Sequence, residues 1–136
     1  ALADMEAMVA RDPDLRFVLK EFPILGPDSQ RAHVVSMAFR SLMPEKYADF
    51  HVTLMKAPGR VTEESAMRVA LSLGADEAAM REAMKNPQIA QAFAGTYELA
   101  NRLSITGTPS YVIGEEVVFG ALGQEVLSQK VDLARN

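Results

Sequence analysis

The stretch SITGTPSYVIG, residues 104–114, places a proline at the start of an apolar run that is typical of a strand. Proline cannot donate a ladder hydrogen bond, so in sheets it is confined to edges, bulges and first positions of strands. Residues 106–108 before it are turn formers, and residues 111–113 after it are aromatic and β-branched, as strands prefer. Pro109 therefore marks a junction between a loop and a strand. An X-Pro bond prefers trans by only about 0.5–1 kcal/mol, so a cis bond is open to it, although a trans turn proline is the ordinary case.

The composition indicates a globular domain with its own hydrophobic core. The 136 residues are 49% hydrophobic and 24% charged, which is ordinary globular usage. The net charge is -4 and no cluster of Lys or Arg stands out, so we expect no nucleic-acid partner and no binding to anionic membranes. No apolar run approaches the about 20 residues of a membrane span.

The sequence contains no cysteine, which excludes a disulfide, a thiolate metal site and a cysteine nucleophile within these residues. The two histidines, His33 and His51, have no metal-like spacing to Asp or Glu, and we expect each at the surface or packed between helices. No hydrolase, zinc-protease or nucleotide-binding motif is present. We therefore expect no metal and no cofactor, and the chain's own residues do not identify an enzyme.

The predicted order of elements is helix, strand, several helices, hairpin, helix. The first helix ends at Asp12-Pro13-Asp14 and lacks an N-cap signal, so we expect its start to lie upstream of Ala1. Residues Leu15 to Phe22 alternate as a strand, which Pro23 closes. Two short strands at Ser110–Ile113 and Val117–Phe119 precede the terminal helix.

The chain between Asp28 and Leu103 has a helical pattern throughout. Gly74 is expected to end one helix and Asp76 to cap the next. Thr62 and Ser65 make an incomplete capping box, because Ser stands where Glu is usual. We expect residues 28–86 to form a separate lobe, and the helix over 86–103 to return to the sheet.

Three stretches, KEFPILG (Lys20–Gly26), GTPSYVIG (Gly107–Gly114) and VVFGALGQEVL (Val117–Leu127), together with the long helical segment, resemble the DsbA-like thiol-disulfide oxidoreductases of the thioredoxin superfamily. The resemblance covers the whole chain. It implies an α/β, thioredoxin-like fold with an inserted helical domain, incomplete at the N-terminus. Its parts are a truncated first helix and a strand at 1–26, the inserted domain at 27–86, and the remaining helix, proline loop, hairpin and terminal helix at 87–136.

The resemblance also implies a substrate site. Thr108-Pro109 is then a cis peptide that faces the redox centre and offers the backbone of Thr108 to an extended substrate. Lys20 and Glu21 end a strand where ligand sites of open α/β sheets gather, so one of them could relay a proton for a buried thiol. The alternative is two charges that reach solvent. Tyr111 and Phe119 could line the substrate groove, although core packing is the simpler expectation.

The departure from this family is the missing CxxC, which its members carry at the start of the first helix, where the helix dipole lowers the pKa of a thiol. Either the cysteines lie upstream of Ala1, or the chain is a cysteine-less relative kept for binding. We favour the first, because a degenerate relative should still show the helix N-cap and the strand before it. A missing central strand would remove roughly five to ten ladder bonds of ~1 kcal/mol each, so we expect upstream residues or a second chain to complete the sheet.

The function implied is disulfide formation or exchange in protein substrates, with protein thiols or disulfides, and a possible redox partner protein, as partners. A non-catalytic peptide-binding or scaffold domain is the alternative, and a glutathione-binding relative is a third. The resemblance implies a bacterial protein of the periplasm or a secreted one. The sequence leaves open whether the reaction is oxidation, isomerisation or reduction, because the dipeptide between the cysteines sets the potential together with the residue before the proline.

Overall fold

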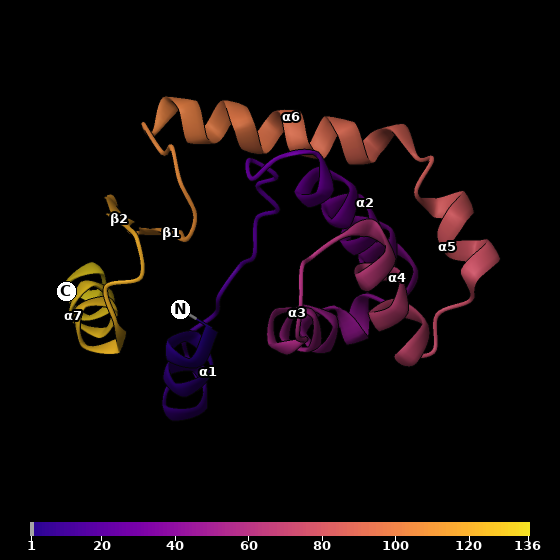
Figure 1. Cartoon of the computed structure of the whole chain (residues 1–136). Helices are drawn as coiled ribbons and strands as arrows, with labels where there is room; N and C mark the ends of the chain where they lie inside the picture. The colour runs from indigo at the N-terminus through magenta and orange to yellow at the C-terminus, as the bar shows by residue number, and fades with distance from the viewer. Residues whose placement is uncertain (1) are drawn as a thin grey trace. The chain divides into compact units, whose positions relative to one another are not determined.

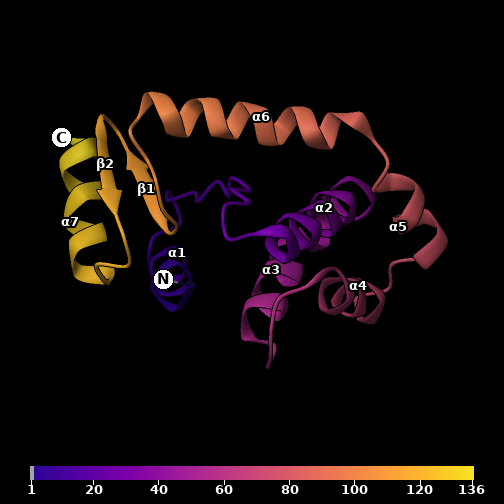
Figure 2. The same cartoon turned by 45° about the horizontal axis from the view of Figure 1, so that its top comes forward.

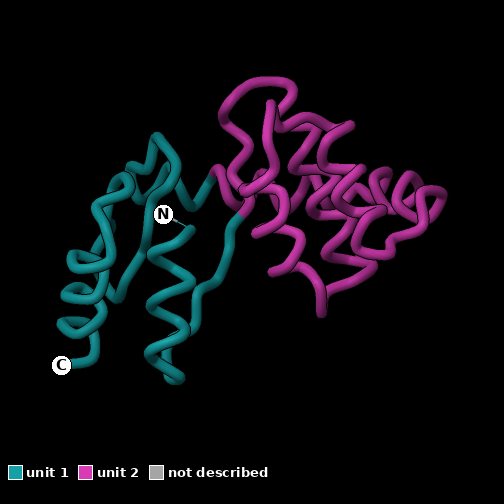
Figure 3. The backbone as a smooth tube through the Cα atoms, turned by 60° about the horizontal axis from the view of Figure 1, so that its bottom comes forward, with its two compact units in different colours: residues 1–20, 98–136 teal, residues 21–97 magenta. Residues whose placement is uncertain are grey.

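The computed structural model describes residues 2–136 (Figure 1). They divide into two compact units, each described by itself below: the hairpin unit, which comprises the residues up to 20 and 98–136, and the helical unit, residues 21–97 (Figure 3). The elements in chain order are α1 (Leu2–Arg11), α2 (Pro27–Leu42), the 3-10 helix η1 (Pro44–Lys46), α3 (Tyr47–Lys56), α4 (Glu63–Ser72), α5 (Glu77–Ala83), α6 (Pro87–Arg102), β1 (Ser110–Ile113), β2 (Glu116–Phe119) and α7 (Gln124–Arg135).

Helix α2 is central in the helical unit, where it packs against α3, α4 and α5. Alanines let the helix backbones approach closely, and four of them are buried: Ala32, Ala38, Ala66 and Ala70. The rings of Phe39 and Phe50 stack between α2 and α3 with their centroids 4.7 Å apart, and both side chains are fully buried. The core of this unit thus combines small side chains, which allow close helix packing, with two large aromatic rings, which fill the space between α2 and α3.

Local capping determines where these helices begin and end. The Thr62–Ser65 capping box is complete, which corrects the expectation from sequence: Ser65 N–H donates to Thr62 Oγ1 at 3.1 Å, and Thr62 N–H donates to Ser65 Oγ at 2.8 Å. Serine replaces glutamate because its hydroxyl also reaches the N-cap backbone. Asp76 caps α5 as predicted, since it accepts from Ala79 N–H at 2.9 Å. Gly74, at φ 100, ends α4 in a conformation that favours glycine.

The hairpin unit is built from α1, the β1–β2 hairpin and α7. The antiparallel register pairs Tyr111 with Val118 and Ile113 with Glu116, and Gly114-Glu115 forms the tight turn. Figure 2 shows α7 alongside the two strands, which agrees with its contacts to β1 and α1. The inner residues of this small core are Met8, Val118 and Leu127, with Leu15, Phe17, Tyr111, Ile113 and Val131 packed against them.

The predicted strand at Leu15–Phe22 is wrong as a hydrogen-bonded element, because within residues 2–136 the only sheet is β1–β2. The alternation that suggested it is present: residues 15, 17, 19 and 21 are half-buried, whereas residues 16, 18 and 20 are exposed. Side chains of this segment therefore alternate in exposure although the segment is not hydrogen-bonded to another strand. Burial of one face is enough to produce the alternation, whereas a β-strand also needs a neighbouring strand to pair with its N–H and C=O groups.

The helical unit extends further at both ends than the predicted insertion at 27–86. It begins at residue 21 and ends at residue 97, so α6 passes from the helical unit into the hairpin unit. Within residues 21–97 the described elements are all helices.

Replacing the fully buried Phe50 by alanine should lower the free energy of unfolding by about 3–5 kcal/mol, because a cavity opens beside Phe39. The matched control is Phe119→Ala, whose side chain is 52% exposed and whose loss should change stability by no more than about 0.5 kcal/mol. Urea unfolding followed by circular dichroism measures both values, and equal losses would contradict this assignment of the core.

Candidate functional site

The loop before β1 is positioned by the end of α6. Ser104 has a φ of 57, and it ends the helix in place of the usual glycine. Ser104 N–H donates to the Asn101 carbonyl at 3.2 Å, and Ile105 N–H donates to the Ala100 carbonyl at 2.8 Å. These two bonds make a Schellman end, which directs the chain out of α6 and toward Thr106-Gly107.

Pro109 joins this loop to the hairpin, and the Thr108–Pro109 peptide is cis, as the resemblance implied. The Pro109 carbonyl accepts from Gly120 N–H at 2.9 Å, and Ser110 Oγ donates to the Gly107 carbonyl at 2.7 Å. Thr108 is exposed, and no hydrogen bond engages its backbone N–H or C=O within the described chain. The loop is therefore fixed on both sides of a residue whose backbone is available to another molecule.

A second polar centre surrounds Glu21, in the helical unit. Ser36 Oγ donates to Glu21 Oε1 at 2.6 Å, and Tyr47 OH donates to the same oxygen at 2.5 Å. His33 Nδ1 contacts the other oxygen, Oε2. The carboxylate thus ties its segment to α2 through His33 and Ser36, and to α3 through Tyr47. We call these four residues the Glu21 cluster.

The Glu21 cluster stabilises the ionised carboxylate of Glu21 in a largely buried position, since the Glu21 side chain is only 10% exposed. Burial alone would raise the pKa of Glu21, but the hydrogen bond and charge of His33, with the hydroxyls of Ser36 and Tyr47, hold that pKa below its ordinary value of 4.5. Burial and the neighbouring Glu21 charge raise the pKa of Tyr47, so its phenol stays a donor. Glu21 is therefore ionised at neutral pH.

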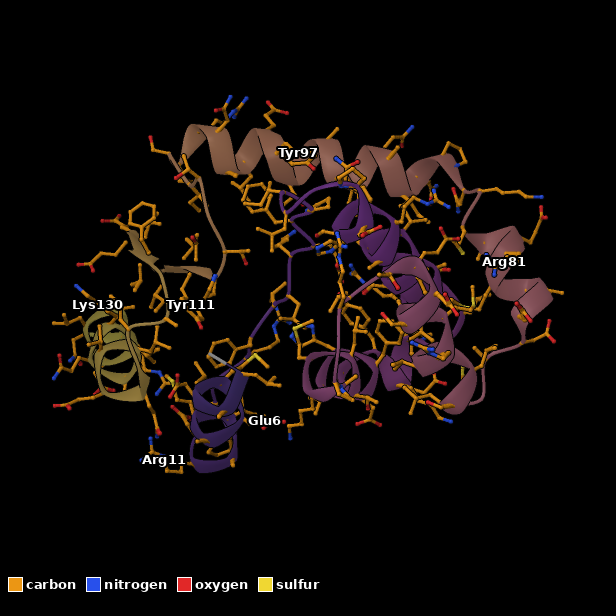
Figure 4. The ribbon with its side chains drawn as sticks, viewed as in Figure 1. Glu6, Arg11, Arg81, Tyr97, Tyr111 and Lys130 are labelled. Carbon is orange, nitrogen blue, oxygen red and sulfur yellow. The ribbon has the colours of Figure 1, made fainter. Side chains whose placement is uncertain are left out.

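The segment that carries Glu21 is also held against α6. Tyr97 points from α6 toward the chain before α2 (Figure 4), and its hydroxyl donates to the Pro23 carbonyl at 2.6 Å. The rings of Tyr97 and Phe22 lie 5.6 Å apart, and Pro23 is fully buried. Three consecutive residues, 21–23, are thus fixed on the helical unit.

The two charges that the sequence paired as a possible relay differ in exposure. Lys20 is exposed, whereas the side chain of Glu21 is only 10% exposed. The alternative of two charges that both reach solvent is therefore wrong for Glu21. His33 and Ser36 were missed as its partners, although their i, i+3 spacing places them on one face of α2. That spacing contains no signal for a carboxylate 12 residues before His33.

The aromatic residues of the hairpin behave differently from each other. Tyr111 packs against the small core of the hairpin unit, as expected, whereas Phe119 does not, since it lies on the outer face of the hairpin with 52% of its surface exposed. In the described part of the chain no group of three His, Cys, Asp or Glu side chains could hold a metal. No helix among residues 2–136 is long and apolar enough to cross a membrane.

Comparison with known proteins places this geometry in a family. The family described as "DSBA-like thioredoxin domain" matches residues 1–132. A thioredoxin-like oxidoreductase from Silicibacter pomeroyi DSS-3 superimposes with a TM-score of 0.92 at 34% identity, over 98% of this chain and 76% of that one. The chain therefore belongs to the DSBA-like thioredoxin domain family and has a thioredoxin-like α/β fold.

Two further solved structures are similar. The thiol-disulfide exchange protein alpha-DsbA2 from Wolbachia pipientis has a TM-score of 0.88 at 29% identity, over 97% of this chain and 72% of that one. A periplasmic thioredoxin-like protein from Salmonella enterica serovar Typhimurium has a TM-score of 0.84 at 22% identity, over 97% of this chain and 73% of that one, which shows the fold alone. No curated protein sequence matches the chain.

The buried charge predicts an acid-sensitive fold. Folding lowers the pKa of Glu21 below 4.5. The ionised Glu21 therefore makes its full contribution to the stability of the folded state above pH 4.5, and this contribution is lost as the pH falls through the pKa of Glu21 in the folded state. Glu21→Gln should lower the free energy of unfolding at pH 7 by about 1–3 kcal/mol and flatten this acid dependence. Urea unfolding between about pH 3 and pH 7 measures both effects.

The control is Glu45→Gln at an exposed carboxylate, which should change the free energy of unfolding at pH 7 by no more than about 0.5 kcal/mol. A second window belongs to His51, whose pKa burial lowers below 6.5 despite the attraction of Glu21. The neutral His51 makes its full contribution to stability above pH 6.5, and stability is lost as the pH falls below that value. His51→Gln should therefore remove this part of the dependence of the unfolding free energy on pH.

Identical pH profiles of stability for wild type and Glu21→Gln would contradict the ionised, buried state of Glu21.

Proposed function

We propose that this chain is part of a thiol-disulfide oxidoreductase that forms or exchanges disulfides in protein substrates. The single observation that carries the proposal is the free backbone of Thr108, held beside Pro109 at the start of β1. An extended peptide can pair with such a backbone by strand-like hydrogen bonds, which recognise main chain rather than one sequence. Membership in the family, and the likeness to a thiol-disulfide exchange protein, support this substrate class.

The nucleophilic thiol of this reaction must come from residues other than these 136. Disulfide exchange proceeds by attack of a thiolate on a disulfide sulfur, and the chain contains no cysteine. In the proposal, residues 1–26 and 87–136 supply the thioredoxin-like scaffold and the Thr108-Pro109 site, with residues 27–86 as an inserted helical domain. A CxxC outside the 136 residues supplies the redox chemistry. Protein thiols or disulfides are the substrates, and a redox partner protein restores the active oxidation state.

The proposed location is the periplasm of a bacterium. A similar fold occurs in a protein named as periplasmic, and an oxidising compartment is where disulfide exchange in protein substrates takes place.

The absence of cysteine favours one second candidate, a non-catalytic domain that binds extended peptides. It would use the same free backbone of Thr108 and the exposed outer face of the hairpin, where Val112 and Phe119 lie. The two candidates differ in one respect only: the first needs thiols elsewhere in the protein, and the second does not.

The test compares two polypeptides in insulin reduction and in oxidation of a model dithiol peptide. Residues 1–136 alone should give no turnover above the uncatalysed rate, because they hold no thiolate. The protein expressed from its complete reading frame should give turnover that blocking its thiols with iodoacetamide abolishes. Turnover by residues 1–136, with contaminating thiols excluded, would contradict this assignment of the chemistry. An inactive complete protein that still binds an extended peptide would instead support the second candidate.

A further inference from the structure

One side-chain hydrogen bond closes the loop in front of β1. Ser110 Oγ donates to the Gly107 carbonyl at 2.7 Å, and within residues 2–136 this carbonyl accepts no other hydrogen bond. In a β-turn such a carbonyl usually accepts from the backbone N–H three residues later, whereas here the hydroxyl of that residue takes its place. The whole loop belongs to the hairpin unit. The orientation of the Gly107 carbonyl therefore depends on one hydroxyl group.

A serine in the helical unit makes the same kind of hydrogen bond in a different setting. Ser72 Oγ, at the end of α4, donates to the Val69 carbonyl at 2.7 Å, also three residues earlier. The Val69 carbonyl accepts from Leu73 N–H at 3.1 Å as well, so the helix backbone holds it without the hydroxyl. Gly107 lies outside the helices and strands of the described chain and has no such backbone partner. The hydroxyl of Ser110 thus orients a carbonyl that the backbone leaves unconstrained.

The Gly107 carbonyl and the Thr108 N–H belong to the same peptide unit, which is trans. Such a unit is planar, and its C=O and N–H point in opposite directions, so whatever orients the carbonyl also orients the N–H. Residue 107 is a glycine, whose backbone is the least restricted by its own side chain. The hydrogen bond from Ser110 therefore fixes a plane that residue 107 by itself would leave free, and it directs the Thr108 N–H away from Ser110.

Ser110 can act as an anchor because the hairpin holds its backbone. It is the first residue of β1 and pairs with Phe119 of β2. The carbonyl of Pro109 is held by backbone alone, since it accepts from Gly120 N–H at 2.9 Å. The hydrogen bond to Gly107, in contrast, is made by a side chain. A substitution at residue 110 can therefore remove it while the pairing of the two strands stays intact.

We propose that Ser110 is a positioning residue for substrate binding, because its hydroxyl orients the peptide plane that presents the Thr108 N–H to the main chain of an extended substrate. This role rests on the proposed function, in which the free backbone of Thr108 pairs with the substrate. Thr108 is exposed, and its N–H has no hydrogen-bond partner in the described part of the chain. A donor that is already held in one direction loses less conformational freedom when a substrate carbonyl reaches it. Ser110 thereby raises the affinity for substrates of many sequences, since the group that it orients pairs with main chain.

The experiment uses the protein expressed from its complete reading frame, with the model dithiol peptide as substrate. Ser110→Ala should raise the KM for the peptide about fivefold to tenfold and leave kcat unchanged, because the oriented N–H binds substrate and transition state alike. The matched control is Ser72→Ala, which removes a hydrogen bond of the same length and spacing from α4 and should leave both constants unchanged. An unchanged KM in Ser110→Ala, or an equal rise in Ser72→Ala, would overturn the proposal.

A second pair of variants separates the hydroxyl from the stability of the fold. Ser110→Thr keeps the hydroxyl, whereas Ser110→Val has a methyl group in its place, and both side chains suit a strand. Ser110→Thr should keep the wild-type KM, and Ser110→Val should show the rise expected for Ser110→Ala. This pair decides the question if Ser110→Ala does not fold, and equal KM values for the two variants would overturn the proposal.

A third measurement needs no substrate. Nitrogen-15 relaxation of the Thr108 N–H should give an order parameter of about 0.85 in the wild type, as for rigid backbone, and below about 0.6 in Ser110→Ala. An order parameter that Ser110→Ala leaves unchanged would overturn the role of the hydroxyl.

Binding of a cysteine-free extended peptide, measured by isothermal titration calorimetry, distinguishes failure of this proposal from failure of the proposed function. A wild-type protein that binds this peptide without turning over the dithiol peptide would contradict the oxidoreductase function. The role of Ser110 would then be decided by the dissociation constant, which should rise about fivefold to tenfold in Ser110→Ala. A wild-type protein that binds no extended peptide would contradict the substrate role of Thr108 and that of Ser110 with it.

Discussion

The ionised carboxylate of Glu21 can be buried only because three donors from two helices surround it. Transfer of an isolated carboxylate out of water costs free energy. The segment that carries Glu21 can therefore pack in this position only when the donors on α2 and α3 are in place as well. Pro23 and Tyr97 extend this fixed region to α6.

The hairpin unit depends on a different balance. Its core is small, with three buried residues, and the outer face of the hairpin stays exposed. Its candidate site is made of backbone rather than side chains, because Thr108 keeps its N–H and C=O free while Gly107 and Pro109 on either side accept hydrogen bonds. In the proposed function, this free backbone recognises an extended chain through main-chain groups and therefore tolerates many substrate sequences.

Several features could be predicted from sequence because they depend on neighbouring residues. Pro109 at a strand start, Asp76 as a cap and Gly74 as a helix end are each set by the local backbone. The strand at 15–22 could not be predicted in the same way, since alternation reports which face is buried but not whether a neighbouring strand is present. The aromatic side chain of Phe119 suggested a core position. In the hairpin, however, Phe119 pairs with Ser110, and this register directs its side chain to the outer face.

The sequence by itself determined the helices, the hairpin and the proline loop, because propensity, capping and turn chemistry act over a few residues. It also determined that these residues hold no thiol. Only the tertiary structure decided that Glu21 would be buried and Lys20 exposed, and that His33, Ser36 and Tyr47 would meet that carboxylate. The physical reason is distance along the chain: the partners lie 12 to 26 residues from Glu21, where no local pattern acts and only helix packing brings donors to the charge.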